Sequence, residues 1–79
     1  MVTSYILLKI SSEQDKNIWN SLSEASWIKE AAWIYGEFDM LLKVEAESLD
    51  SLDNLIFDDL RKIEGIKSTT TLLVSKIKK

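Results

Sequence analysis

Two short polar segments contain the residues of this chain best suited to binding a small molecule. They are Tyr35-Gly36-Glu37-Phe38-Asp39 and Ser68-Thr69-Thr70-Thr71. Asp39 can accept hydrogen bonds from a cationic group, and Gly36 lets the backbone approach a ligand without a Cβ in the way. Thr69 and Thr71 lie on the same face of a strand and can offer two neighbouring hydroxyls.

Each of these features also has a purely structural explanation. Gly36 can serve the turn between two strands, and Asp39 can hydrogen-bond its own local backbone. Residues 68–71 also match an ordinary half-exposed strand, because threonine favours strands. Taken singly, each residue is explained better by structure than by ligand binding.

The composition excludes most catalytic and metal-binding chemistry. The 79 residues include no cysteine and no histidine, so a thiolate nucleophile, the commonest acid–base residue and the commonest metal ligand are missing. Asp58 and Asp59 beside Glu64 could form a cation site, but a solvated helix face is the default explanation. We therefore expect no enzymatic activity, no metal and no cofactor.

Charge and hydropathy restrict the partners. The net charge of −3 argues against a duplex DNA surface, which needs clustered lysine and arginine. Trp19, Trp27 and Trp33 could stack on bases, but packing in the core or at a subunit interface is favoured. No signal peptide and no apolar run of membrane-spanning length is visible. The sequence predicts a soluble, cytoplasmic protein.

Gly36 and Gly65 divide the chain into two halves that resemble each other. Each half begins with an apolar strand-like run, continues into a helical pattern and returns to strand character. Strands are expected at 2–10, 27–35, 38–45 and 66–77. Helices are expected after a Ser12 capping box and from Ser48 to a positive-φ Gly65. The order βαββαβ predicts a ferredoxin-like α+β sandwich, an antiparallel four-stranded sheet with two helices on one face, in a single domain over 1–79.

One face of this sheet has no helix to cover it. Ile6 and Leu8 share one face of the first strand, whereas Tyr5 and Leu7 lie on the other. On the third strand Leu41 likewise lies on the face opposite to Met40 and Leu42. A solvated face should be more polar. We therefore predict that the open face stacks on its copy, giving a homodimeric α/β barrel.

The two polar segments also resemble conserved motifs of a known family. Residues 35–44 are similar to the Gly-acidic-aromatic-Asp segment that opens the third strand in Lrp/AsnC regulators, and residues 64–74 are similar to the final Gly-Val-…-Thr-x-Thr strand of that family. The resemblance covers essentially the whole chain and corresponds to the effector domain, or RAM domain. The family's helix-turn-helix domain has no counterpart, so we expect a stand-alone member without direct nucleic-acid binding.

The resemblance implies an amino-acid-sensing domain that oligomerises. It implies dimers assembled into a ring, an octamer or a decamer, with free amino acids bound between dimers. A full-length Lrp/AsnC-type regulator is a candidate partner, which the chain would modulate by mixed assembly. The implied ligand residues are Gly36 and Asp39, then Thr69 and Thr71, with Tyr35, Glu37, Ser68 and Thr70 in second rank.

Two other functions and one related fold compete with this interpretation. Small dimeric barrels of this fold include oxygenases and isomerases, but these usually depend on histidine. A ligand-free assembly module is the second alternative. A domain of the ACT type would bind the same class of ligand with its sheets side by side.

Overall fold

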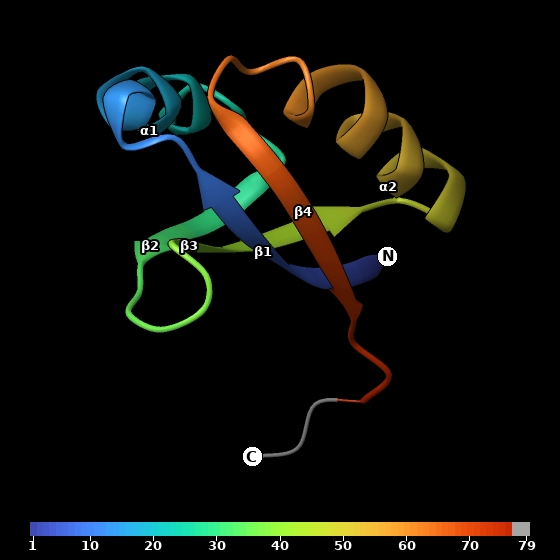
Figure 1. Ribbon diagram of the computed structural model, residues 1–79. Coiled ribbons are helices and arrows are strands. Elements are labelled where there is room, and N and C mark those ends of the chain that lie inside the picture. The colour runs from blue at the N-terminus through green and yellow to red at the C-terminus, as the bar shows by residue number, and fades with distance from the viewer. Residues whose placement is uncertain (77–79) are drawn as a thin grey trace.

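The computed structural model describes residues 1–76. Its elements are β1 (Val2–Ile10), the short 3₁₀ turn η1 (Ser12–Gln14), α1 (Asp15–Ser23), β2 (Ile28–Trp33), β3 (Met40–Ala46), α2 (Leu49–Asn54), the π-helical segment η2 (Leu55–Leu60) and β4 (Ile66–Leu73). The four strands form one antiparallel sheet in the order β2-β3-β1-β4, and α1 and α2 lie on the same side of it (Figure 1). This confirms the predicted ferredoxin-like fold.

The core forms between the helices and one face of the sheet. Successive side chains of a strand point to opposite faces, and the even-numbered residues of β1 and β3 are the buried ones. Together with buried residues of the helical segments, these strand residues form the hydrophobic core: Ile6, Leu8, Ile10, Met40, Leu42, Val44, Ala46, Ile18, Leu22, Leu52, Ile56 and Leu60. The period of two in the sequence correctly separated the two faces of each central strand, and the structure shows that the even-numbered face is the buried one.

The first helix begins differently from the prediction. Ser11 and not Ser12 precedes the helical region, and neither Ser11 nor Gln14 makes a side-chain cap. The chain enters through the η1 turn, where the Gln14 N–H donates to the Ser11 carbonyl at 3.0 Å. The predicted capping box at Ser12 is therefore wrong, because a 3₁₀ turn already provides a backbone partner for this N–H group.

The second helix starts as predicted and ends early. The Ser48 hydroxyl accepts from the Ser51 N–H at 3.1 Å, so Ser48 is the N-cap. After Asn54 the helix widens into the π-helical η2, and the Arg61 N–H donates to the Ile56 carbonyl at 3.0 Å. This i→i+5 bond is the mark of a π turn. The helix ends at Leu60, so Gly65 is not its C′ residue.

Gly65 instead forms the entry into β4. Its φ is +101°, a backbone conformation that glycine adopts most easily. Its carbonyl accepts from the Ser11 N–H at 2.7 Å, which fastens this turn to the end of β1. A Cβ at Gly65 would lie 2.4 Å from the Gln14 Cβ and 3.0 Å from the Ile18 Cδ1. Close packing against α1 and the positive φ together require glycine here.

The face of the sheet opposite the helices carries a band of apolar residues. Leu7 lies opposite Leu41 on β3, and Tyr5 lies opposite Leu72 on β4. These four residues define the open face. Within the chain Tyr5, Leu7 and Leu41 are half-buried and Leu72 is 50% exposed. The predicted uncovered apolar surface is present.

Three strands are shorter than predicted, and one of them, β3, begins at Met40 and not at Phe38 and runs to Ala46. β2 covers Ile28–Trp33 and not 27–35, and β4 ends at Leu73. The predicted end of the last strand, Ile77, lies outside the described residues. Within residues 1–76 no helix is long and apolar enough to cross a membrane.

Candidate functional site

Asp39 is the most firmly positioned of the predicted ligand residues. Its Oδ2 accepts from the Ile10 N–H at 2.9 Å, and its own N–H donates to the Leu8 carbonyl at 2.8 Å. Its carbonyl accepts from the Ile34 N–H at 3.0 Å, which closes the loop between β2 and β3. The predicted bond from Asp39 to its own local backbone is replaced by a bond to β1. The second carboxylate oxygen makes no hydrogen bond to the described residues and can receive a cation.

Most of this loop is open to solvent, including Asp39 itself, whereas Phe38 is half-buried. Gly36 has φ +114°, and a Cβ there would have no heavy atom within 4 Å. Tyr35 is fully exposed and Glu37 is also exposed. Gly36 is therefore required by the turn, as the structural explanation held, and its surroundings leave room for another molecule to approach.

The four predicted residues of β4 divide between the two faces of the sheet. Thr69 lies opposite Leu8 and Thr71 opposite Ile6, so both lie on the helix-facing side, as predicted. Ser68 lies opposite Lys9 and Thr70 opposite Leu7, which places this second pair on the open face. The two pairs therefore lie on opposite faces of β4, although Ser68 and Thr69 both border a cavity at the start of this edge strand.

The loop and β4 do not meet within one chain. β1 lies between β3 and β4 in the sheet. Asp39, just before the start of β3, is therefore two interstrand spacings, about 10 Å, from Thr69 on β4. The hydrogen bond between Ser11 and Gly65 also lies at this end of the sheet. The ammonium and the carboxylate of an α-amino acid are attached to the same carbon, so these two groups cannot span such a gap.

Each group instead lines a cavity of its own. The loop cavity holds about 200 Å³ and is lined by Ile10, Ser12, Asp15, Trp33, Ile34 and Asp39. The β4 cavity holds about 390 Å³ and is lined by Arg61, Ile66, Lys67, Ser68 and Thr69. The first carries two carboxylates and no basic residue, whereas the second carries two cations and no acidic residue. The charged residues that border the two cavities are therefore of opposite sign.

The sequence alone does not identify the two basic residues that line the β4 cavity, Arg61 and Lys67. Arg61 lies outside both polar segments, and Lys67 falls within residues 64–74 but is not among the ligand residues that the resemblance implies. Arg61 reaches the β4 cavity because η2 ends at this residue, and its guanidinium lies 4.4 Å from the centre of the Phe57 ring. Only the early end of the helix, which the sequence did not predict, brings Arg61 beside β4.

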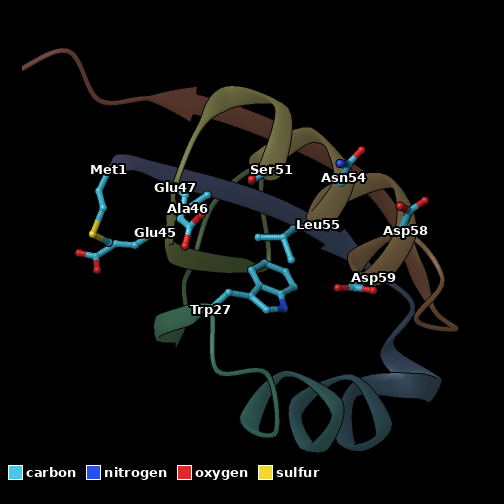
Figure 2. A pocket seen from close by; sticks show the side chains of 10 residues that line it. All are labelled: Met1, Trp27, Glu45, Ala46, Glu47, Ser51, Asn54, Leu55, Asp58 and Asp59. Atoms are coloured by element: carbon cyan, nitrogen blue, oxygen red, sulfur yellow. The ribbon is translucent and has the colours of Figure 1, made fainter.

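A wider cavity of about 470 Å³ lies elsewhere and contains none of the predicted ligand residues. Figure 2 shows its lining, which comes from the end of β3, from α2–η2 and from Trp27: Met1, Trp27, Glu45, Ala46, Glu47, Ser51, Asn54, Leu55, Asp58 and Asp59. Asp58 and Asp59 are exposed. In residues 1–76 no cluster of three or more potential metal ligands is present.

The tryptophans pack, as expected, against other parts of the chain. Trp19 of α1 and Trp33 of β2 stack with ring centroids 5.4 Å apart and planes 14° apart. Trp19 and Trp27 are half-buried against the core, and Trp33 is 49% exposed. Their arrangement joins α1 to the edge of the sheet next to the loop cavity.

The structure is a ferredoxin-like sandwich with one uncovered sheet face, and the sequence identifies its family. Residues 3–79 match the family described as "Lrp/AsnC ligand binding domain". The chain belongs to this family, which confirms the resemblance noted from the sequence.

Two relatives illustrate where this domain occurs. An uncharacterised HTH-type transcriptional regulator of Pyrococcus furiosus is 28% identical over 78 residues, which are 99% of this chain and 53% of that protein. A homocitrate synthase of Saccharolobus solfataricus is 36% identical over 72 residues, which are 85% of this chain and 15% of that enzyme. The chain thus spans about half of the regulator and a small part of the enzyme.

Solved structures share the fold closely. A hypothetical protein of Pyrococcus horikoshii is 34% identical with a TM-score of 0.86, and 94% of this chain matches 89% of it. AsnC of Escherichia coli is 25% identical with a TM-score of 0.92, over 96% of this chain and 52% of AsnC. A transcriptional regulator of Neisseria meningitidis, solved as an L-Met complex, is 17% identical with a TM-score of 0.91, over 95% and 50%.

Proposed function

We propose that this chain is an amino-acid-binding regulatory domain that acts as a homo-oligomer and has no chemistry of its own. The observation that carries the proposal is the Asp39 carboxylate, which the Ile10 N–H holds at 2.9 Å in an acidic cavity of a chain from a ligand-binding family. A fixed carboxylate binds an ammonium with little loss of conformational freedom. The regulator solved with L-Met shows that a protein of this fold takes an amino acid.

Oligomerisation is the second part of the proposal. The open face of Tyr5, Leu7, Leu41 and Leu72 supplies a self-complementary apolar surface, which suits a two-fold dimer. The loop and β4 lie too far apart for one ligand within a chain, so a complete site requires a second chain. Dimers assembled into a ring of eight or ten chains would bring these surfaces together.

The effect of the bound amino acid depends on the partner. Matches to a transcriptional regulator and to homocitrate synthase are consistent with one sensing domain that serves different output proteins. We propose that this chain modulates an Lrp/AsnC-type regulator by mixed assembly. Such a partner would supply the DNA contact that the net charge of −3 argues against in this chain.

A thermal-shift screen of the twenty amino acids tests the binding proposal. A ligand that binds only the folded state at one hundred times its Kd stabilises it by about 2.7 kcal/mol. For a domain of this size that corresponds to a rise in Tm of roughly 10–20 °C. We expect such a rise for at least one amino acid. No rise for any of them at millimolar concentration would refute amino-acid sensing.

The Asp39→Asn variant then tests the site. The amide oxygen of asparagine can still accept from the Ile10 N–H, so the fold is expected to be retained. The negative charge is lost, so affinity for the amino acid should fall at least tenfold, measured by calorimetric titration. Asp53→Asn, an exposed change on α2 outside the loop cavity, is the control. Unchanged affinity in Asp39→Asn would remove Asp39 from the site.

A further inference from the structure

We propose that the wider cavity beside α2–η2 is a second binding site and that its ligand is an aliphatic diamine. This inference goes beyond amino-acid sensing, because the wider cavity contains none of the predicted ligand residues and is complete within one chain. It is lined by Ala46, the last residue of β3, whereas Asp39 precedes the first residue of that strand. The two sites therefore lie at opposite ends of β3.

The first argument is the placement of the carboxylates in the lining. Glu45 and Glu47 lie at one end of the wider cavity, and Asp58 and Asp59 lie at the other (Figure 2). In the described part of the chain no three acidic residues come together as metal ligands do, so the four carboxylates do not converge on one point. Two separated pairs of negative charges suit a ligand with two separated positive charges.

The second argument is the apolar surface between the two pairs. The indole of Trp27 and the side chain of Leu55 lie between Glu45 and Asp59 (Figure 2), and both are half-buried. The methylene groups of an alkyl chain are buried favourably against such a surface. The face of an indole also attracts an ammonium group. An apolar centre with charged ends matches a diamine, whereas it offers nothing to a bare metal ion.

The third argument is the way the helical segment forms one wall. Ser51, Leu55 and Asp58 are spaced by four and three residues, and all three line the wider cavity from one side of α2–η2. Leu52 and Ile56, beside them on the same segment, are buried in the core. The core therefore holds this wall in place before a ligand binds, which lowers the entropic cost of binding.

The charges of the wider cavity are not neutralised by the described residues. Neither lysine nor arginine lines it. The one ion pair within residues 1–76 joins Lys43 to Glu30, so the Met1 ammonium pairs with none of the four carboxylates. Like charges around one cavity repel each other, and a bound dication relieves this repulsion.

Matched amines test the class of ligand. Putrescine, cadaverine and hexamethylenediamine are titrated calorimetrically into the wild-type protein, each beside the monoamine of the same chain length: butylamine, pentylamine or hexylamine. We expect at least one diamine to bind about tenfold more tightly than its monoamine, because only a diamine contacts both carboxylate pairs. Equal binding of each diamine and its monoamine, or no binding of any diamine at millimolar concentration, would overturn the inference.

A double variant tests the position of the site. Asp58→Asn with Asp59→Asn removes the carboxylates from one end, and both residues are exposed, so the fold is expected to be retained. The affinity for the diamine should fall about tenfold, to that of the monoamine. Asp53→Asn with Glu64→Gln is the matched control, since it removes the same charge from exposed residues outside the wider cavity. An equal loss in both variants would mean that the net charge alone attracts the diamine.

Cadaverine and lysine separate this inference from the proposed function, because they share a carbon skeleton and differ by the α-carboxylate. Cadaverine binding is expected to survive Asp39→Asn unchanged and to exceed any lysine binding that this variant retains. If Asp39→Asn abolishes cadaverine binding, the diamine occupies the loop cavity and the inference falls. If diamines bind as expected but no amino acid binds the wild type, the proposed function falls and the diamine site stands.

Discussion

Replacing Gly65 with alanine is expected to lower the free energy of unfolding by about 2–4 kcal/mol. A non-glycine residue at positive φ costs roughly 1–2 kcal/mol, and forcing a methyl group into a packed site costs about 1–3 kcal/mol. Both apply, because φ is +101° and the new Cβ would lie 2.4 Å from the Gln14 Cβ. Moving Gly65 away would break its 2.7 Å hydrogen bond to Ser11. A domain of this size has about 4–12 kcal/mol in total, so the loss is severe.

Gly36→Ala is the matched control for this prediction. Its φ of +114° also disfavours alanine, but a Cβ there would meet nothing within 4 Å. We expect it to lose about 1–2 kcal/mol, from the backbone alone. Urea unfolding of both variants at one protein concentration measures the difference. Equal losses would show that the contact between Gly65 and α1 contributes little to stability.

The sequence predicts the sheet well because each central strand carries a period of two. Ile6 and Leu8 are completely buried and Leu7 between them is half-buried, as the alternation requires. The same pattern on β3 separates Met40, Leu42 and Val44 from Leu41, and the structure shows that the helices cover the first group. Two βαβ units joined by short loops, each with a right-handed crossover, are compatible with few strand orders. The ferredoxin-like order is one that satisfies these rules.

The helix ends are not predictable in the same way. Leu52, Ile56 and Leu60 are spaced four residues apart. This spacing predicts a regular α-helix that continues towards Gly65. In the structure this repeat stays on the buried side because η2 is π-helical, and all three residues are buried. No local signal marks the change of hydrogen bonding, since packing against the sheet decides it.

The candidate site is predictable in part, for a related reason. The family motif identifies Asp39, whose hydrogen bond to Ile10 joins residues 29 positions apart. That partner, and the cavity around it, depend on the pairing of β1 with β3. Lys67 belongs to β4 itself, whereas Arg61 lies beside this strand only through tertiary structure, and surface cations in a sequence look alike. Residue types predict what can bind, whereas topology decides which of them act together.

The open face leads to the prediction with the largest effect on assembly. Leu7→Arg places a charge in the centre of the apolar band, opposite Leu41. In a two-fold dimer the change enters twice, and each buried leucine contributes about 1.5–3 kcal/mol. We expect the dimer Kd to rise at least a hundredfold, with monomers at micromolar concentration in sedimentation equilibrium. Amino-acid binding should weaken in parallel if, as we propose, a complete site needs two chains.

Leu49→Arg is the control, since it makes the same exchange at an exposed leucine of α2, on the opposite side of the sheet. Leu49 is 53% exposed, so its replacement should leave the dimer intact. Circular dichroism of Leu7→Arg checks that the monomer keeps its fold, because Leu7 is half-buried within the chain. A wild-type chain that sediments as a monomer, or a Leu7→Arg variant that still forms dimers, would mean that the apolar band contacts something other than its own copy.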